Sequence, residues 1–135
     1  MKGNPQNMMQ QIQYDKLLED VLYYLSEKVA LAKSFGINDI ILDPGFGFAK
    51  NTFQSFTILK HLNLFKTFGL TILVGLSRKS MIYKTLGTSS NEALNGTTVL
   101  NTYALTQGAN ILRVHDVKEA VECIELLEVL KQAEE

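Results

Sequence analysis

Apolar and polar positions along this chain follow two spacings, one typical of amphipathic helices and one typical of buried strands. From position 14 onward, apolar residues recur three or four positions apart, which predicts a helix of about five turns that ends at Gly36. Its inward positions are Tyr14, Leu17, Leu18, Val21, Leu25, Val29 and Ala32. Residues 1–12 are polar and include the turn signal Gly3-Asn4-Pro5, so they are expected to form a loop.

Three nearly continuous apolar runs predict strands, and the segments between them have helical spacing. The strands are expected over residues 37–42, 70–74 and 109–114, and the helices over residues 53–68, 77–86, 90–107 and 117–131. The first of these helices would bury Phe56, Leu59, either Leu62 or Leu64, and Phe65. Ser89 with Glu92 resembles a capping box at one helix start, and Asp116 with Glu119 resembles an N-cap at another.

This alternation of helices and strands predicts a parallel sheet that is covered on both faces. Right-handed crossovers carry the carboxyl end of every strand to the same edge of such a sheet. A closed barrel of eight strands takes roughly 250 residues, whereas this chain has 135. We therefore expect an α/β fold that forms the C-terminal part of a (β/α)8 TIM barrel and begins just after the fifth strand. The whole chain, residues 1–135, would belong to a single barrel domain.

Composition narrows the class of protein further. The chain is 46% hydrophobic with a net charge of −1, which indicates a soluble domain without a general attraction to nucleic acid or anionic membranes. A single cysteine, Cys123, excludes an intrachain disulfide and favours the cytoplasm, and we expect it to be a small core residue. No signal peptide or membrane-spanning run is expected. With only His61 and His115 beside that cysteine, no metal-ligand cluster is predicted within the chain.

The first strand ends at Asp43, which is followed by Pro-Gly and Phe-Gly-Phe. A carboxylate directly after an apolar strand needs a partner. Asp43 could cap its own turn, or it could accept two parallel N–H groups from a ligand at the strand end, where parallel α/β folds bind ligands. Phe46 and Phe48 could fill the core, or one of them could form a flat wall for a ring, with Gly47 allowing close backbone approach.

The second strand ends at Gly75, followed by Leu76-Ser77-Arg78-Lys79-Ser80. This segment could be a basic surface turn before a helix. Alternatively, the glycine leaves space beside two cations and two hydroxyls, which suits a planar or anionic ligand. The glycine spacing of a Walker phosphate-binding loop is absent.

Arg113 and His115 end the third strand, and strand alternation places both on the same face. Two potentially cationic donors side by side form a grip for phosphate or pyrophosphate. The alternative is that His115 binds backbone and Arg113 pairs with Asp43. Together, the three strand ends predict a transfer reaction that depends on positioned electrostatics, since no nucleophile elbow is present.

These motifs, taken in order, resemble the dihydropteroate synthase family. The resemblance rests on KGNPQNM at residues 2–8, LDPGFGFAK at 42–50, VGLSRKS at 74–80 and ILRVHD at 111–116. It implies a pterin-binding (β/α)8 barrel, usually a homodimer through helices of its C-terminal part. The implied reaction joins 6-hydroxymethyl-7,8-dihydropterin pyrophosphate to p-aminobenzoate and releases pyrophosphate.

The resemblance also implies roles for individual residues. Asp43 and Lys79 would act in catalysis and bind the pterin, together with Phe48 and Gly75. The aminobenzoate pocket would be bordered by Ser77, Arg78 and Lys79. The pyrophosphate would be held by Arg113 and His115. Mg²⁺ is implied as a cofactor whose ligand lies in the missing N-terminal part of the barrel.

Two alternatives remain beside the synthase. One is an inactive half-barrel that only binds or assembles, because the absent half would carry further site residues. The other is a different pterin-binding barrel, such as a methyltetrahydrofolate-binding methyltransferase, although such proteins lack the Ser-Arg-Lys and Arg-Val-His elements.

Overall fold

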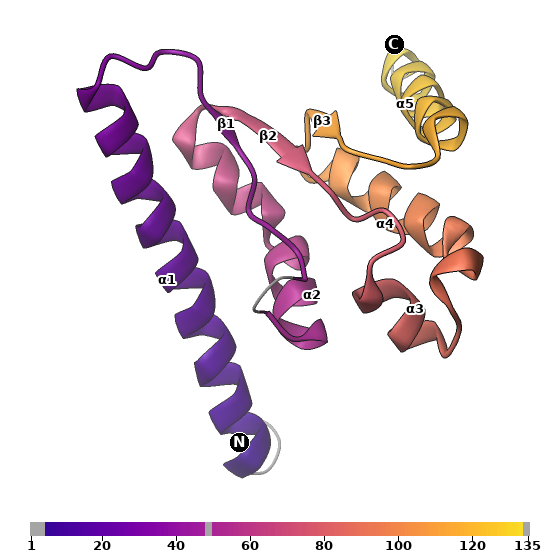
Figure 1. Cartoon of the computed structure of the whole chain (residues 1–135), viewed down its shortest axis with the longest axis horizontal. Coiled ribbons are helices and arrows are strands. Elements are labelled where there is room, and N and C mark those ends of the chain that lie inside the picture. Colours follow the sequence, from indigo (N-terminus) through magenta and orange to yellow (C-terminus); the bar gives the residue numbers. More distant parts are fainter. Residues whose placement is uncertain (1–4, 48–49, 134–135) are drawn as a thin grey trace.

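A computed structural model describes the backbone of residues 5–47 and 50–133, and the side chains of residues 16–47 and 50–133 (Figure 1). Helices and strands alternate along this part of the chain, as the apolar pattern predicts. The α-helices are α1 (Pro5–Ser34), α2 (Thr52–Lys60), α3 (Ser80–Leu86), α4 (Leu94–Thr106) and α5 (Val117–Gln132). The strands are β1 (Ile41–Leu42), β2 (Thr71–Val74) and β3 (Ile111–Leu112), and two 3-10 helices are η1 (Leu62–Phe68) and η2 (Ser90–Glu92).

The first helix is longer than its apolar spacing indicates, and the loop expected over residues 1–12 is wrong from Pro5 onward. Proline is well tolerated at the first helical position because its missing N–H would have no helical partner there. The glutamines and methionines that follow are good helix formers, so the helix extends through them. Residues 1–4 lie outside the described part. The predicted stop at Gly36 is confirmed by its φ of +84°.

Two predicted helix starts are capped differently from the sequence expectation. The side chain of Ser89 makes no capping hydrogen bond, and a short 3-10 turn precedes α4 instead. Glu92 accepts a 3.1 Å bond from the Thr88 hydroxyl, so it is not the second half of a capping box with Ser89. At the start of α5, Asp116 occupies the N-cap position, but its carboxylate binds Arg78 rather than the helix backbone.

The predicted helix over residues 53–68 is divided at His61 into α2 and η1. This division settles one alternative, because Leu62 is fully buried whereas Leu64 is 38% exposed. The αL conformation of Gly69 ends the segment as expected. Cys123 is buried on α5, which confirms its assignment to the core.

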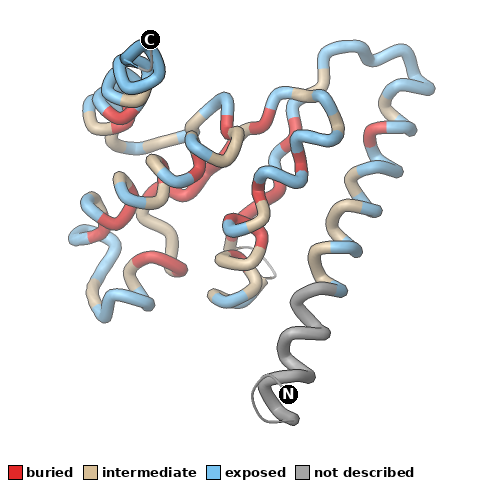
Figure 2. Tube along the Cα trace, turned by 180° about the vertical axis from the view of Figure 1, so that it is seen from behind, coloured by how far each residue is buried: buried red, intermediate tan, exposed pale blue. Residues whose placement is uncertain are grey.

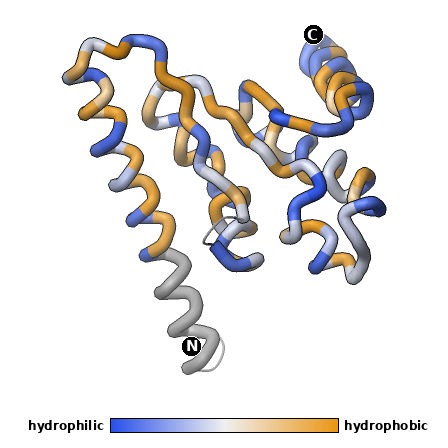
Figure 3. The backbone as a smooth tube through the Cα atoms, in the orientation of Figure 1, coloured by the Kyte–Doolittle hydropathy of each residue, from blue (hydrophilic) through white to orange (hydrophobic). Residues whose placement is uncertain are grey.

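The three strands form a parallel sheet in the order β1-β2-β3. The register pairs Leu42 with Ile72 and Val74 with Leu112. Figure 3 shows apolar residues along β2 and β3 that give way to hydrophilic residues where the strands end.

Only one face of this sheet is covered by helices within the described residues, so the expectation of cover on both faces is wrong for this chain. Ile72 and Val74 of β2 are buried, whereas Thr71 of the same strand, which points to the opposite face, is exposed. Ile41 and Ile111, on the face of Thr71, are 55% and 38% exposed. In a closed barrel this face is the interior, which the remaining strands would complete.

The core lies between the sheet and the helices that pack against it. Figure 2 shows the buried positions gathered along the strands, α2, η1, α3 and α4, whereas α5 is largely exposed. The largest core side chains with almost no exposure are Phe46, Ile58, Leu59, Leu62, Phe65, Ile72, Val74, Leu76 and Met81. The core therefore fixes the strand ends from behind and leaves their other face open to a ligand.

Candidate active site

The carboxyl ends of the three strands bring their polar side chains together on the open face of the sheet. Alternation places Asp43, Gly75 and Arg113 on the same face as Ile41, Leu73 and Ile111 respectively. The contacts agree with this placement. Arg113 Nη1 lies 3.5 Å from Asp43 Oδ2, and a Cβ built on Gly75 would lie 2.6 Å from Arg113 Nη2. The guanidinium of Arg113 therefore lies across Gly75 and reaches toward Asp43.

A small cavity of about 130 Å³ opens at this point. Its lining consists of Gly75, Ser77, Lys79, Arg113, Val114 and His115, which come from the ends of β2 and β3. Except for Val114, all of these residues belong to the predicted site. The structure therefore brings the residues that follow β2 and those that follow β3 into one cavity. Arg113 connects that cavity to Asp43, which follows β1.

Asp43 uses both of its carboxylate oxygens. Oδ1 accepts a 3.0 Å bond from the backbone N–H of Gly45, so the carboxylate caps its own turn. Oδ2 forms the ion pair with Arg113, whose side chain is 57% exposed while that of Asp43 is 35% exposed. Exposed ion pairs contribute only about 0–1 kcal/mol, so a ligand with two N–H donors could replace this one at little cost. The structure thus contains both non-ligand contacts proposed for Asp43 and leaves its side chain partly exposed.

Lys79 is held against the turn that follows β1. Its Nζ donates a 2.6 Å bond to the carbonyl of Phe46, whose side chain is only 1% exposed and belongs to the core. Gly47 adopts a φ of +95°, and a Cβ built on it would lie 3.8 Å from Lys79 Cδ. Glycine is favoured there by the left-handed backbone conformation, whereas the space beside Lys79 would admit a Cβ. Phe48, the predicted wall of the pterin pocket, lies outside the described residues.

The ammonium group of Lys79 lies in a partly buried and positively charged environment. Burial lowers the pKa of Lys79, and the positive charge of Arg113 lowers it further, while the carboxylate of Asp43 opposes the shift. A cation with a lowered pKa gains most from a negatively charged neighbour, so this environment favours an anionic ligand.

Ser77 and His115 form a pair across the ends of β2 and β3. The Ser77 hydroxyl oxygen accepts a 3.1 Å bond from the backbone N–H of His115 and lies 2.8 Å from His115 Nδ1. Ser77 is only 7% exposed, whereas His115 is exposed at the cavity. The alternative prediction was that His115 binds backbone, whereas the described contact of its ring is with the Ser77 side chain.

Arg78 points away from this cavity and is held by the neighbouring turn. Its Nε and Nη2 donate 2.9 and 3.1 Å bonds to the two carboxylate oxygens of Asp116, and Nη1 donates to the carbonyls of Ser90 and Asn91. Bonds from the guanidinium lower the pKa of the Asp116 carboxyl. The role of Arg78 in aminobenzoate binding stays a prediction.

The backbone of Arg78 adopts a left-handed conformation with φ of +54°. This conformation is unfavourable for residues other than glycine and is often retained at functional sites. The N–H of Arg78 donates a 2.9 Å bond to the Thr97 hydroxyl of α4, which holds the turn in place. Sequence reasoning missed Thr97 and Asp116 as supports of this turn. Asp116 follows Arg78 by the offset of the β2–β3 register, which only the structure reveals.

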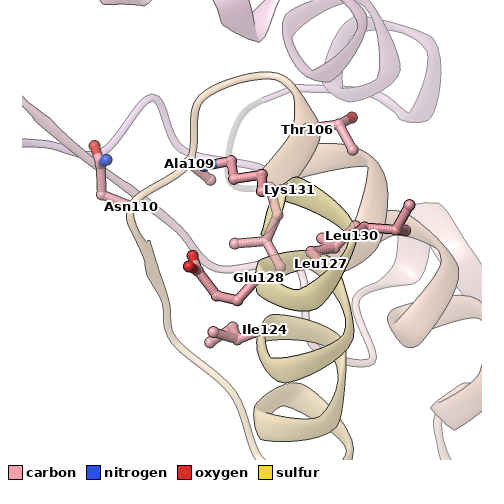
Figure 4. A pocket seen from close by; sticks show the side chains of 9 residues that line it. Thr106, Ala109, Asn110, Ile124, Leu127, Glu128, Leu130 and Lys131 are labelled. Carbon is pink, nitrogen blue, oxygen red and sulfur yellow. The ribbon is translucent and has the colours of Figure 1, made fainter. Parts of the chain in front are cut away.

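A larger cavity of about 460 Å³ lies elsewhere, between α4, α5 and the start of β3. Figure 4 shows Asn110 and Ala109 on one side of it, and Glu128 and Lys131 on α5 on the other. This cavity lies at the amino end of β3, whereas ligands in parallel barrels bind at the carboxyl ends of the strands. We therefore place the candidate site at the smaller cavity.

Among the described side chains, no group of three or more His, Cys, Asp or Glu residues could hold a metal ion. No helix in the described part of the chain is long and apolar enough to cross a membrane.

The fold and the site together define a segment of a parallel α/β barrel that has a cavity lined by Lys79, Arg113 and His115 at the carboxyl ends of its strands. A model of the pterin binding enzyme family matches residues 1–115, and the chain belongs to this family. Its relatives are dihydropteroate synthases, which confirms the resemblance read from the sequence motifs. The chain is 42% identical over 137 residues to the dihydropteroate synthase of Escherichia coli (strain K12), covering 100% of this chain and 49% of that protein.

Solved structures give the same result for the fold. The dihydropteroate synthase of Yersinia pestis in a sulfonamide drug complex superposes with a TM-score of 0.84 at 38% identity, covering 98% of this chain and 49% of that one. The enzyme of Xanthomonas albilineans in complex with 7,8-dihydropteroate has a TM-score of 0.83 at 32% identity, covering 87% of this chain and 47% of that one. The expected α/β barrel fold is thus confirmed. The chain spans about half the length of the E. coli relative.

Proposed function

We propose that this chain supplies one part of a dihydropteroate synthase, which joins 6-hydroxymethyl-7,8-dihydropterin pyrophosphate to p-aminobenzoate and releases pyrophosphate. The observation that carries the proposal is the cavity at the strand ends, where Lys79, Arg113 and His115 surround an open space next to the carboxylate of Asp43. This combination provides a grip for an anion beside an acceptor for a ring with parallel N–H donors.

The pterin would bind on the side of Asp43. Its 2-amino group and ring N–H would donate to the carboxylate, which requires the pterin to replace Arg113 at Oδ2. The space beside Gly75, which the Arg113 guanidinium occupies in this structure, would become free for the ring once Arg113 leaves Asp43. Lys79 would donate to the pterin from the opposite side. Phe48 is proposed as a wall of this pocket on the strength of the sequence motif alone.

The pyrophosphate would be held by Arg113 and His115. When the pterin displaces Arg113 from Asp43, Arg113 becomes available to bind the departing pyrophosphate. One pterin pyrophosphate molecule can therefore contact both Asp43 and Arg113. Stabilising the negative charge that develops on the leaving group favours early cleavage of the C–O bond, and Asp43 favours the positive charge left on the pterin methylene. The weakly basic amine of p-aminobenzoate can then attack without a strong general base.

The p-aminobenzoate would bind beside the same cavity, bordered by Ser77, Lys79 and the aliphatic part of Arg78. The guanidinium of Arg78 is already bonded to Asp116 and to two carbonyls, so its direct contribution to the pocket would be its stem. Lys79 lies between the pterin and aminobenzoate positions, which is why we assign it a catalytic role together with Asp43.

Calorimetry tests the assignment of Asp43. We expect the chain to bind a pterin pyrophosphate analogue and the Asp43→Asn variant to bind it about tenfold or more weakly, because a charge-assisted contact is lost. Asp39→Asn, in the exposed segment that precedes β1, is the matched control and should bind as the native chain does. Equal binding by the Asp43 variant and the native chain would refute the assignment.

A second measurement separates the enzyme from the half-barrel that only binds or assembles. p-Aminobenzoate is added with the pterin pyrophosphate, and release of pyrophosphate is measured. The open sheet face specifically favours the half-barrel alternative, because Ile41 and Ile111 are exposed on it. Ligand binding without pyrophosphate release would support that alternative, whereas release would support the synthase. No observation favours the methyltransferase alternative, since the relatives named above are synthases.

Three further properties remain proposals. A homodimer through the outer helices is supported by exposed apolar side chains at Leu86 on α3 and Val99 on α4, which adjoin an apolar groove of about 250 Å³. Mg²⁺ stays a prediction, with its ligand expected outside this chain. A cytoplasmic location is proposed from the single cysteine.

A further inference from the structure

The contacts between the ends of β2 and β3 continue beyond the sheet in the register of the strands. Leu73 pairs with Ile111 and Val74 with Leu112, an offset of 38 residues. Two side-chain pairs keep that offset after the strands have ended, namely Ser77 with His115 and Arg78 with Asp116.

Ser77 replaces a backbone acceptor in this series. The N–H of Arg113 donates a 2.9 Å bond to the Val74 carbonyl, and the next bond in a parallel ladder would join the His115 N–H to the Leu76 carbonyl. That carbonyl instead accepts a 3.1 Å bond from the N–H of Lys79, because the chain turns there. The Ser77 hydroxyl takes its place and accepts from the His115 N–H at 3.1 Å.

The same hydroxyl lies 2.8 Å from Nδ1 of the His115 ring, so its hydrogen-bonding capacity bears on which ring nitrogen carries the proton. A serine hydroxyl has one proton to donate and two lone pairs to accept with. Since one lone pair takes the His115 backbone N–H, donation of the hydroxyl proton to Nδ1, 2.8 Å away, satisfies the buried group completely. If Nδ1 carried the proton, the hydroxyl would accept twice, and no other acceptor for its proton is present among the described residues.

We propose that Ser77 is a positioning residue for His115: its hydroxyl binds Nδ1, which keeps the neutral imidazole protonated at Nε2 and ready to donate to an oxyanion in the cavity. In functional histidines, the hydrogen bond made by one ring nitrogen commonly determines whether the other nitrogen carries the proton. The inference rests on the proposed function only for the identity of the anion, pyrophosphate. It gives Ser77 a role toward the leaving group, in addition to its proposed place beside the aminobenzoate.

Nuclear magnetic resonance of the uniformly ¹⁵N-labelled chain tests the tautomer directly. Long-range ¹H–¹⁵N correlations are recorded at a pH at which the imidazoles are neutral, with His61 as the second histidine of the chain for reference. We expect His115 to be protonated at Nε2 in the native chain. In Ser77→Ala the two tautomers should become mixed, and Ser77→Thr, which keeps the hydroxyl, should restore the native pattern. Ser89→Ala is the control, because Ser89 is exposed and makes no capping bond.

The same variants are then titrated with pyrophosphate. Ser77→Ala should bind it about two- to tenfold more weakly, the range expected for one misdirected hydrogen bond, while Ser77→Thr should bind as the native chain does. A native His115 protonated at Nδ1 would overturn the proposal, and that result does not depend on whether any variant folds. An unchanged tautomer in a folded Ser77→Ala variant would also overturn it. If the tautomer responds as expected but pyrophosphate binds to none of the proteins, the positioning role stands and the proposed function fails.

Discussion

Replacing Gly75 by alanine is expected to displace Arg113 without disturbing the fold. A Cβ at this position would lie 2.6 Å from Arg113 Nη2, 3.0 Å from Nε and 3.1 Å from Cζ. These atoms belong to the end of a flexible side chain that is 57% exposed, so the guanidinium can move away into solvent. The backbone of Gly75 is not left-handed, so alanine is not strained there.

The expected magnitudes follow from these contacts. Stability should change by less than about 1 kcal/mol, because an exposed ion pair contributes about 0–1 kcal/mol and replacing glycine at a compatible position returns about 0.4–1 kcal/mol. The affinity for pyrophosphate should fall more. Loss of a hydrogen bond to a charged group costs about 1.5–3 kcal/mol, and the exposure of Arg113 argues for the lower end, which corresponds to about tenfold weaker binding.

Calorimetric titration with pyrophosphate and urea denaturation measure the two quantities on the same samples. Arg113→Ala is the matched variant, and the double variant completes a thermodynamic cycle. Because the alanine at position 75 acts by moving Arg113, it should add little to the loss that Arg113→Ala causes alone. Native affinity in Gly75→Ala, or a further large loss in the double variant, would refute this reasoning.

Two other predictions concern stability. Gly96→Ala in α4 should lower the unfolding free energy, because the new Cβ would overlap the Cγ2 atom of buried Ile82. Such overpacking costs about 1–3 kcal/mol, whereas the higher helix propensity of alanine contributes about 1 kcal/mol. Urea denaturation checks this, and Asn95→Ala, on the exposed side of the same helix, should not destabilise; a Gly96 variant as stable as its control would contradict the packing argument. Arg78 lowers the pKa of Asp116 in the folded chain. The carboxylate therefore contributes fully to stability when the pH is above its ordinary pKa of 3.8, and this contribution is lost as the pH falls through the lowered pKa. Unfolding midpoints measured from neutral to acidic pH should therefore decline less steeply in Asp116→Asn, and an unchanged pH profile would contradict this.

The order of helices and strands could be predicted because apolar spacing depends on local geometry and burial alone. The stops at Gly36 and Gly69 were equally predictable, since glycine adopts the left-handed conformation that ends a helix. The start of α1 was not, because a turn signal such as Gly3-Asn4-Pro5 also describes a helix that begins at its proline. Sequence spacing cannot distinguish these two cases.

Cover on both faces of the sheet was inferred from continuous apolar runs. This inference assumes a complete barrel, of which this chain contains only part. The residues of β2 are apolar on both faces because a barrel strand packs against helices outside and against other strands inside. The exposed Ile41 and Ile111 are explained if strands beyond this chain face them. The apolar composition of such a strand is thus explained by its contacts in a complete barrel.

The candidate site was predictable where a motif places its side chain at a strand end. Strand alternation alone puts Arg113 and His115 on one face, and the shared edge of the sheet brings them near Lys79. Alternation also predicts that Arg78 is directed opposite to Ser77 and Lys79, and its side chain indeed lies outside the cavity. Its partner Asp116 and its left-handed backbone could not be predicted, because they depend on the turn that follows the strand.

The register of β2 against β3 therefore determines both the packing of the core and the chemistry of the site. A slip of one residue would turn Ile72 and Val74 from the helix-covered face to the open face, which the burial of both side chains opposes. The same slip would move Ser77 away from His115 and Arg78 away from Asp116, since both pairs have the offset of the strands. Apolar burial behind the sheet thus holds in place the polar pairs in front of it. The geometry of the candidate site is for this reason most sensitive to changes that shift the register, and less sensitive to changes on the exposed helices.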